Sequence, residues 1–340
     1  MIKDKIRGSL IGSAIGDGFG YPTEFMDLNQ IKEKWGKQGL VEPIGDIIKV
    51  TDDTQMAISV AKSIMRSYKS NSLNKELFES TLIEEFITWL NDKENNRAPG
   101  MTCINSCEKL EKGMNWEEAT AKNSKGCGAN MRVLPIGLLK FKNKKITNSE
   151  ISKWSQYQSV ITHGHQTALV ASELTAITVV KILEGIHPNE LVDDLINYCK
   201  SQLGMYHADY LKNIWQRPGI ISKEDFINRG WEDCLLVLQR VKSGLLNQDK
   251  IEDPCDTTGE GWIAEEAFGT ALLCFLMYPN DSKKVLITAV NTRRDSDSSA
   301  CIAGAFGGAY NGIDSFAEDW VNRIEYKKEL NEYLDFLERG

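Results

Sequence analysis

The stretch that decides the fold is residues 295–309, which read Asp295-Ser296-Asp297-Ser298-Ser299-Ala300-Cys301-Ile302-Ala303-Gly304-Ala305-Phe306-Gly307-Gly308-Ala309. At helical spacing, Ala300, Gly304 and Gly308 share one face. Side chains this small let a second helix backbone approach closely, so we expect a central, buried helix. The aspartates at its start then lie near buried structure, where carboxylates must be paired, protonated or bound to metal.

The rest of the chain also repeats its apolar residues at helical spacing. Alternating patterns typical of strands are nearly absent, apart from a possible short strand near 44–50. Since no segment is typical of an interdomain linker, the sequence predicts an all-α fold, a compact single-domain helical bundle over residues 1–340. The helices are predicted at 4–15, 54–66, 76–90, 131–141, 148–161, 167–184, 190–202, 231–243, 264–278, 282–290, 298–310 and 317–338.

The composition is ordinary for a soluble globular protein. Of the 340 residues, 41% are hydrophobic and 26% are charged, and the net charge is −8. No run of about 18 apolar residues predicts a membrane span, and Met1 to Lys5 do not resemble a secretory signal. An acidic chain is not expected to bind nucleic acid or membranes. We therefore expect a cytoplasmic protein, and a monomer.

The eight cysteines are scattered and form no CxxC pair. Several lie in apolar runs, which is typical of buried thiols in a reducing compartment. Cys103 and Cys107 are one helical turn apart, but no cluster of histidines or further cysteines completes a zinc site.

A second acidic cluster, Thr51-Asp52-Asp53-Thr54, also precedes a helical pattern. A single aspartate there could simply cap the helix. Two adjacent acids between two threonines exceed what a cap needs. For Asp295 and Asp297, the alternative to metal binding is ion pairing with the neighbouring Arg293 and Arg294.

Three further motifs contain residues suited to binding a ligand. The first, Gly16 to Glu24, has alternating glycines that are expected to end the first helix and to admit a ligand close to the backbone. The second, Gly126 to Arg132, is a glycine turn at a helix start that could receive a phosphate or a ribose. The third is Thr162-His163, which could also be a polar helix junction. The sequence contains no HExxH, GxSxG or P-loop motif.

Taken in order, these motifs resemble the ADP-ribosylglycohydrolase family. The matching elements run from Gly8 to about Gly312 and are Gly16-Asp17-x-x-Gly20-x-x-x-Glu24, Thr51-Asp52-Asp53-Thr54, the Gly126–Arg132 turn, Thr162-His163, Trp262-Ile263-Ala264-Glu265-Glu266-Ala267 and Asp295-Ser296-Asp297-Ser298. The resemblance implies an all-α hydrolase with two Mg²⁺ ions, or Mn²⁺ as the alternative, in a cleft.

The resemblance also implies roles for individual residues. The metal ligands would be Thr51, Asp52, Asp53, Asp295, Asp297 and Ser298. The catalytic candidates, which we do not rank, are Glu24, Asp52 and Asp53. The substrate-binding residues would be Asp17, Gly20, Gly126, Cys127, Gly128, Met131 and His163. Hard divalent ions prefer such oxygen ligands, and nearby carboxylates stabilise the charge that develops when a glycosidic bond breaks.

The expected activity is removal of ADP-ribose from a modified protein side chain, most plausibly arginine. The alternatives are hydrolysis of a free ADP-ribosyl or O-acyl-ADP-ribose compound, and a non-catalytic protein that binds ADP-ribose. Family members often have glycines where this chain has Arg293-Arg294. These two cations could pair with nearby acids, hold a phosphate, contact a protein substrate or point to solvent.

Overall fold

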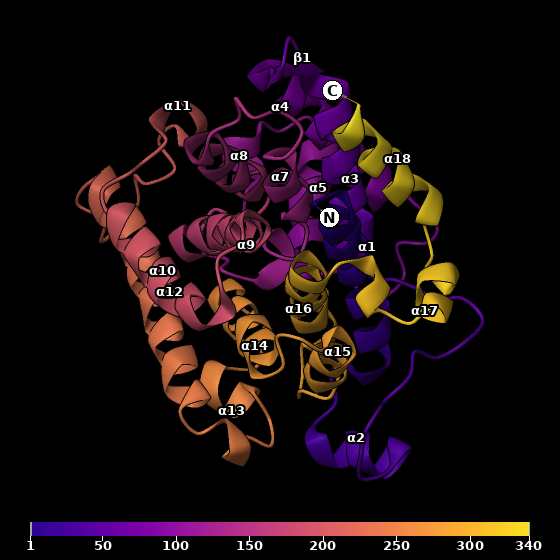
Figure 1. The fold of residues 1–340 in the computed structure, drawn as a ribbon. Helices are drawn as coiled ribbons and strands as arrows, with labels where there is room; N and C mark the ends of the chain where they lie inside the picture. Colours follow the sequence, from indigo (N-terminus) through magenta and orange to yellow (C-terminus); the bar gives the residue numbers. More distant parts are fainter. Residues whose placement is uncertain (1, 340) are drawn as a thin grey trace.

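Two helices rich in small residues lie side by side in the middle of the molecule. α1 (Ile2–Gly20) and α16 (Ser296–Asn311) pack along their lengths (Figure 1). A Cβ atom added to Gly16 would lie only 2.0 Å from the carbonyl oxygen of Ala300. The backbones therefore touch where other residues would carry side chains, and the central helix predicted from residues 295–309 is confirmed.

The computed structural model describes residues 2–339, so Met1 and Gly340, the ends of the predicted domain, lie outside the described residues. Within that range the all-α class is confirmed, and the one sheet is a hairpin of β1 (Tyr68–Lys69) and β2 (Ser72–Leu73). The other α-helices are α2 (Leu28–Trp35), α3 (Asp52–Ser67), α4 (Lys75–Leu90), α5 (Met101–Glu111), α6 (Trp116–Ala119), α7 (Leu134–Leu139), α8 (Asn148–Val160), α9 (Gln166–Glu184), α10 (Pro188–Ser201), α11 (Ala208–Leu211), α12 (Lys223–Leu245), α13 (Cys255–Thr258), α14 (Ala264–Met277), α15 (Ser282–Val290), α17 (Glu318–Arg323) and α18 (Lys327–Glu338). The 3₁₀ helices are η1 (Tyr21–Thr23), η2 (Cys127–Ala129), η3 (Gln248–Lys250) and η4 (Ile313–Ser315).

The prediction that the first helix ends at its glycines was wrong. α1 continues through Gly16 and Gly18 to Gly20, and none of the three has the positive φ of a helix cap. These glycines serve close packing instead, since a Cβ on Gly20 would lie 2.6 Å from the Cα of Asp297. The aspartate between them is thereby held inside a buried helix.

Other element boundaries also differ from the predictions. No strand forms over 44–50 in the described chain, where Ile48 makes only an isolated bridge with Ile324. The helix predicted at 317–338 is two helices, because the chain turns at Tyr326 with a φ of 53°. The helices α2 and α5 were not predicted.

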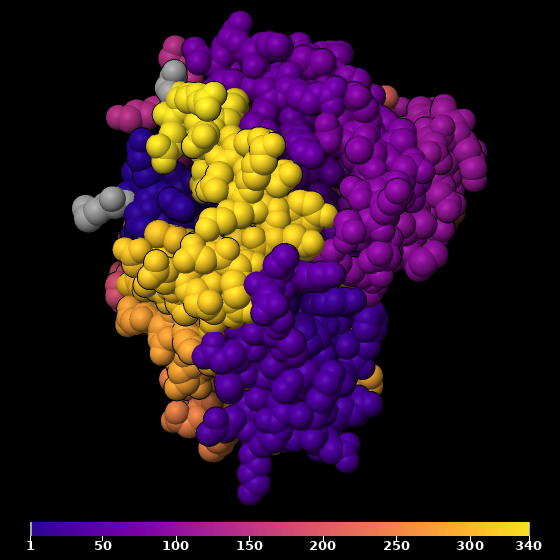
Figure 2. Space-filling model, turned by 90° about the vertical axis from the view of Figure 1, so that its right-hand side faces the viewer, coloured from indigo at the N-terminus to yellow at the C-terminus, as the bar shows by residue number. Residues whose placement is uncertain are grey.

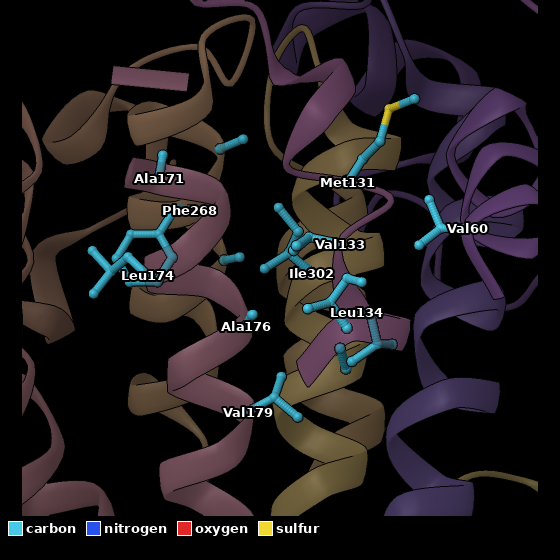
Figure 3. Packing of buried hydrophobic residues seen from close by; sticks show 14 of the residues in the cluster. Val60, Met131, Val133, Leu134, Ala171, Leu174, Ala176, Val179, Phe268 and Ile302 are labelled. Carbon is cyan, nitrogen blue, oxygen red and sulfur yellow. The ribbon is translucent and has the colours of Figure 1, made fainter. Parts of the chain in front are cut away.

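The core surrounds α9. This helix packs against α7, α8, α12, α14 and α16, and Figure 3 shows Ala176 and Val179 of α9 close to Val133, Leu134 and Ile302. By length and composition α9 could cross a membrane, with a mean hydropathy of 1.4, which differs from the expectation that the sequence has no such run. However, 89% of that window is buried inside the protein. Its apolar character is that of a central core helix.

The C-terminal segment braces the start of α3. Figure 2 shows the yellow C-terminal residues lying across the indigo N-terminal part of the chain. The amide of Val50 donates to Glu325, and the guanidinium of Arg97 donates both to the carbonyl of Val50 and to Glu325. The residue just before the Thr51 cluster is thereby held from two sides.

Candidate active site

The two aspartate clusters meet at the N-termini of α3 and α16. The hydroxyl of Thr51 caps α3 by accepting from the amide of Asp53. Across the gap, Ser298 Oγ in the first turn of α16 donates to Asp53 Oδ1 at 3.3 Å. Each helix directs the positive end of its dipole at this point, which favours negative charge there. Residues more than 240 positions apart in sequence thus form one acidic centre.

Asp17 of α1 lies behind this centre and orients it. Its carboxylate accepts hydrogen bonds from the amides and hydroxyls of both Thr51 and Thr54. The side chain is fully buried, and a carboxylate oxygen of Asp17 lies within 4.8 Å of one from Asp53 and one from Asp297. Because Asp17 already accepts so many hydrogen bonds, we assign it to holding Thr51 and regard Asp53 and Asp297 as the more available ligands.

A cavity of about 430 Å³ opens onto the acidic centre, a volume suited to a small-molecule ligand. Its acidic wall consists of Glu24, Asp52, Asp53, Asp295, Asp297 and Ser298. The facing wall consists of Ala98, Pro99, Gly100, Met101, Thr102, Cys103, Gly126, Cys127, Gly128, Met131 and His163, with Phe25 and Trp262 completing the lining.

In the absence of cations, the acidic wall favours protonated carboxyl groups. Burial raises the pKa of Asp53 and Asp295 well above the usual range, and repulsion from Asp297 raises both further. Burial is the main cause that raises the pKa of Glu24 to about 11, and repulsion from Asp297 is the second. No cationic side chain lines the cavity among the described residues. Positive charge bound there would therefore stabilise the ionised cluster.

Three oxygens of the acidic wall are free to bind a cation. Glu24 Oε2, Asp53 Oδ2 and Asp297 Oδ1 are buried and have no hydrogen-bond partner. Buried polar atoms normally have one, so these call for an explanation. Thr51 Oγ1, which donates to Asp17, also keeps a lone pair. Carboxylate and hydroxyl oxygens in this arrangement fit Mg²⁺ or Mn²⁺.

The facing wall is built on glycines. Gly126 makes an antiparallel bridge with Ile263. A Cβ on Gly128 would lie 2.9 Å from Cε1 of His163 and 2.8 Å from Sγ of Cys103. Only glycine leaves room for the imidazole at that position. All five residues predicted on this side, Gly126, Cys127, Gly128, Met131 and His163, line the cavity.

Asp17 and Gly20 are the two predicted substrate-binding residues that do not line the cavity. Both belong to α1, which lies behind the start of α16, so the acidic wall separates them from the open space. The reason is the close packing of the two helices, which the motif alone does not reveal. Asp17 contributes to the site through Thr51 instead.

The mouth of the cavity carries two exposed aromatic rings. Phe25 and Trp262 stack with ring centroids 5.4 Å apart and are 55% and 39% exposed. Phe25 has a φ of 67° and Arg294 a φ of 74°, both in the left-handed region that favours glycine. The amide of Phe25 donates to the carbonyl of Arg294, and the amide of Arg294 donates to that of Met26. These bonds hold Phe25, the residue after Glu24, against the start of α16. Backbone strain from positive φ angles at residues other than glycine is often found at functional sites.

The adjacent arginines differ in environment. Arg293 pairs with Asp253 at 3.1 Å and with Asp256 at 2.5 Å, away from the acidic wall. Arg294 is partly exposed, and its closest carboxylate oxygen, on Glu260, is 3.9 Å away. Of the alternatives for these cations, pairing with nearby acids is the one that Arg293 adopts, and the guanidinium of Arg294 lies near Glu260 and the carbonyl of Phe25. Neither arginine pairs with Asp295 or Asp297 in the described chain, so the ion-pairing alternative for those aspartates is wrong.

Several lining residues were missed from the sequence. Ala98 to Thr102 lie between the helices predicted at 76–90 and 131–141 and belong to no motif, yet the amide of Gly100 donates to Asp52 Oδ2 at 3.1 Å. Phe25 directly follows the matched residue Glu24, and Trp262 belongs to a matched motif, so the sequence held a usable signal for both. The 98–102 segment has no such signal, because only the tertiary fold brings it to α3.

The chain is similar in sequence to a known protein family over its whole length. A family model described as ADP-ribosylglycohydrolase matches residues 1–340. ADP-ribosylhydrolase ARH3 of Mus musculus is 26% identical over 98% of this chain and 91% of its own length. ADP-ribosyl-[dinitrogen reductase] glycohydrolase of Rhodospirillum rubrum is 22% identical over 99% and 96%. ADP-ribosylarginine hydrolase Tri1 of Pseudomonas putida is 22% identical over 98% and 78%.

The fold is also similar to a solved structure titled ADP-ribosylglycohydrolase-related protein complex. The TM-score is 0.70, and the alignment covers 99% of this chain and 98% of the other at 20% identity. At this identity, the likeness shows that the two chains share a fold.

Proposed function

Because the chain belongs to the ADP-ribosylglycohydrolase family and is therefore a hydrolase of ADP-ribose linkages, we propose that it uses two bound divalent metal ions to cleave ADP-ribose from modified arginine side chains of proteins. The proposal that the protein binds metal ions rests on the acidic wall. Three buried carboxylate oxygens, on Glu24, Asp53 and Asp297, have no hydrogen-bond partner, and all three residues line the cavity.

The proposed ligands are Thr51, Asp52, Asp53, Asp295, Asp297 and Ser298, as expected from the sequence. Mg²⁺ is the proposed metal and Mn²⁺ the alternative. When bound, the cations would neutralise the cluster, bind ribose hydroxyls and increase the acidity of a water molecule. The protein's own part is to hold the ribose between the acidic wall and the Gly126–Gly128 turn.

Among the three catalytic candidates, we assign proton transfer to Glu24. Asp52 and Asp53 belong to the proposed metal ligands, and each already accepts one hydrogen bond, from the amide of Gly100 and from Ser298 respectively, whereas Glu24 is not in the proposed ligand set. Glu24 lines the cavity on a loop, and one of its oxygens has no partner. A carboxyl group so placed can pass a proton between water and the leaving group as the glycosidic bond breaks.

The mouth of the cavity supports arginine as the leaving group. A guanidinium is planar and cationic, and it stacks on aromatic faces. Phe25 and Trp262 present such faces directly beside Glu24. Two of the relatives act, by their names, on ADP-ribosylated dinitrogen reductase and on ADP-ribosylarginine.

We further propose that the protein acts as a cytoplasmic monomer.

The test uses purified protein with Mg²⁺ or Mn²⁺ and three substrates, linked to ADP-ribose through arginine, serine or an acyl group. We expect release of free ADP-ribose from the arginine linkage, abolished by a chelator. Asp297→Ala should lose both metal binding, measured by calorimetry, and release. Unaltered metal binding would exclude the proposed ligand set. Release from a different linkage would correct the leaving group, and ADP-ribose binding without release from any substrate would favour a non-catalytic role.

A further inference from the structure

A buried arginine, Arg132, lies behind the facing wall of the cavity. The guanidinium of Arg132 is fully buried and lies over the ring of Phe86, 4.4 Å from its centroid. Within the described chain it makes no ion pair with a carboxylate. It donates instead to the side chain and carbonyl of Gln158 and, through NH2, to Thr162 Oγ1 at 2.8 Å. Burying a cation without an anion is costly, so this position calls for an explanation beyond packing.

The hydroxyl of Thr162 transmits the effect of the arginine. This hydroxyl has one proton to donate, and one lone pair already accepts from Arg132. Its other side-chain partner in the described chain is Nδ1 of His163, at 2.8 Å. The proton of the hydroxyl therefore points to Nδ1, which must accept it.

The other forms of the imidazole are disfavoured. If Nδ1 carried the proton, both it and Arg132 would donate to Thr162 Oγ1, and the buried hydroxyl proton would have no acceptor. The imidazolium form has the same defect, and burial together with the charge of Arg132 lowers the pKa of His163 to about 3.

We infer that Arg132 and Thr162 are positioning residues that fix His163 as the neutral tautomer with its proton on Nε2, where it donates to an oxygen of the bound ADP-ribose. This rests on the proposed function for the identity of the ligand. The side chain of His163 lines the cavity, and its Nε2 would be 3.2 Å from a Cβ on Gly128 and 3.4 Å from one on Gly126. Glycine at both positions keeps the space around Nε2 open.

The arrangement suits its surroundings. The opposite wall carries the carboxylates and the proposed cations, so the phosphate and ribose oxygens of the substrate need donors on this side. A neutral N–H of fixed direction supplies one without placing an imidazolium beside Arg132. Its orientation is set before the substrate binds, which lowers the entropy lost on binding.

The tautomer is measurable by NMR without any substrate. The chain has four histidines, and His163→Gln identifies the signal of His163 in long-range ¹H–¹⁵N spectra of histidine-labelled protein. We expect a protonated Nε2 and an unprotonated Nδ1 across neutral pH. Thr162→Ser should keep this pattern, and Thr162→Val should shift the proton toward Nδ1. A wild-type spectrum in which the His163 signal has its proton on Nδ1 would overturn the inference.

The donor role is tested with ADP-ribose and Mg²⁺ in calorimetry. Loss of one hydrogen bond should weaken ADP-ribose binding about tenfold in Thr162→Val, whereas Thr162→Ser stays within about twofold of wild type. Mg²⁺ binding should be unchanged in both. Equal ADP-ribose affinity in the two variants, with the tautomer shifted in one, would overturn the donor role. Absence of ADP-ribose binding in the wild type would instead contradict the proposed function. The NMR spectra would still test the tautomer of His163, because they need no substrate.

Discussion

Thr51 Oγ1 donates a 2.7 Å hydrogen bond to Oδ1 of Asp17, which joins the start of α3 to the last turn of α1. This bond orients the hydroxyl so that its remaining lone pair is available to a cation. It also explains why a residue without access to the cavity belongs to the site. The geometry of the acidic wall therefore depends on the packing of α1 against α16.

Asp17→Asn should weaken metal binding without removing any proposed ligand. All four groups that face Asp17, the amides and hydroxyls of Thr51 and Thr54, donate to it. The amide nitrogen of asparagine would place another donor among them. We expect at least a tenfold loss of Mg²⁺ affinity and a fall of about 2 kcal/mol in the free energy of unfolding, measured by calorimetry and urea denaturation. The exposed Asp46→Asn is the matched control, and equal Mg²⁺ affinity in the two variants would contradict this role.

Gly16→Ala should destabilise the fold although alanine favours helices. The new Cβ would lie 2.0 Å from the carbonyl oxygen of Ala300, so α1 and α16 must separate. We expect the free energy of unfolding to fall by about 3 kcal/mol. Gly307→Ala is the control, because its Cβ meets only Ser282, whose closest atom is Oγ at 3.3 Å, and a change within about 1 kcal/mol is expected. Similar urea midpoints for the two variants would be evidence against backbone contact between the helices.

The stability of the metal-free protein should fall as the pH rises. Burial raises the pKa of Asp52 to about 8 and that of Asp17 to about 7, from ordinary values of 3.8, and repulsion from Asp297 adds to both. Between about pH 4 and pH 8 the folded state then binds more protons than the unfolded state, so the free energy of unfolding decreases with pH.

Divalent cations should reverse this dependence, since they bind the ionised carboxylates and displace protons. The measurement is the melting temperature across this pH range, with a chelator and with saturating Mg²⁺. A melting temperature that rises with pH in the chelator, or that Mg²⁺ leaves unchanged near pH 8, would contradict the cation site.

Trp262→Ala should affect arginine-linked substrates more than serine-linked ones. Stacking of a guanidinium on an aromatic face contributes about 1 kcal/mol, so kcat/KM for the arginine linkage should fall about fivefold, and Trp262→Phe should retain most of the activity. The indole is 39% exposed at the mouth, so the fold should tolerate both changes. An equal loss for both linkages would assign the ring to ADP-ribose rather than to the leaving group.

Several features could be predicted from the sequence because they depend on local spacing or on chemistry shared with a family. The small faces of residues 295–309 predicted the central helix, and the family resemblance implied that the acids at two helix starts form a joint site. The boundaries at Gly16 and near Tyr326 were wrong. A glycine after an apolar helix normally indicates a cap, whereas here it serves contact with another helix. The turn at Tyr326 follows a bridge between Ile324 and Ile48, two residues far apart in the sequence.

By itself, the sequence determined the helical class, the central helix, the family resemblance and the two acidic clusters, since periodicity and motif order are properties of the chain alone. Only the tertiary structure decided that Asp17 orients Thr51, that Gly100 reaches Asp52, and that Arg132 acts on His163 through Thr162. Each of these contacts joins segments that no local pattern links. They form because close backbone packing buries these polar groups together, and buried polar groups must then bond to one another.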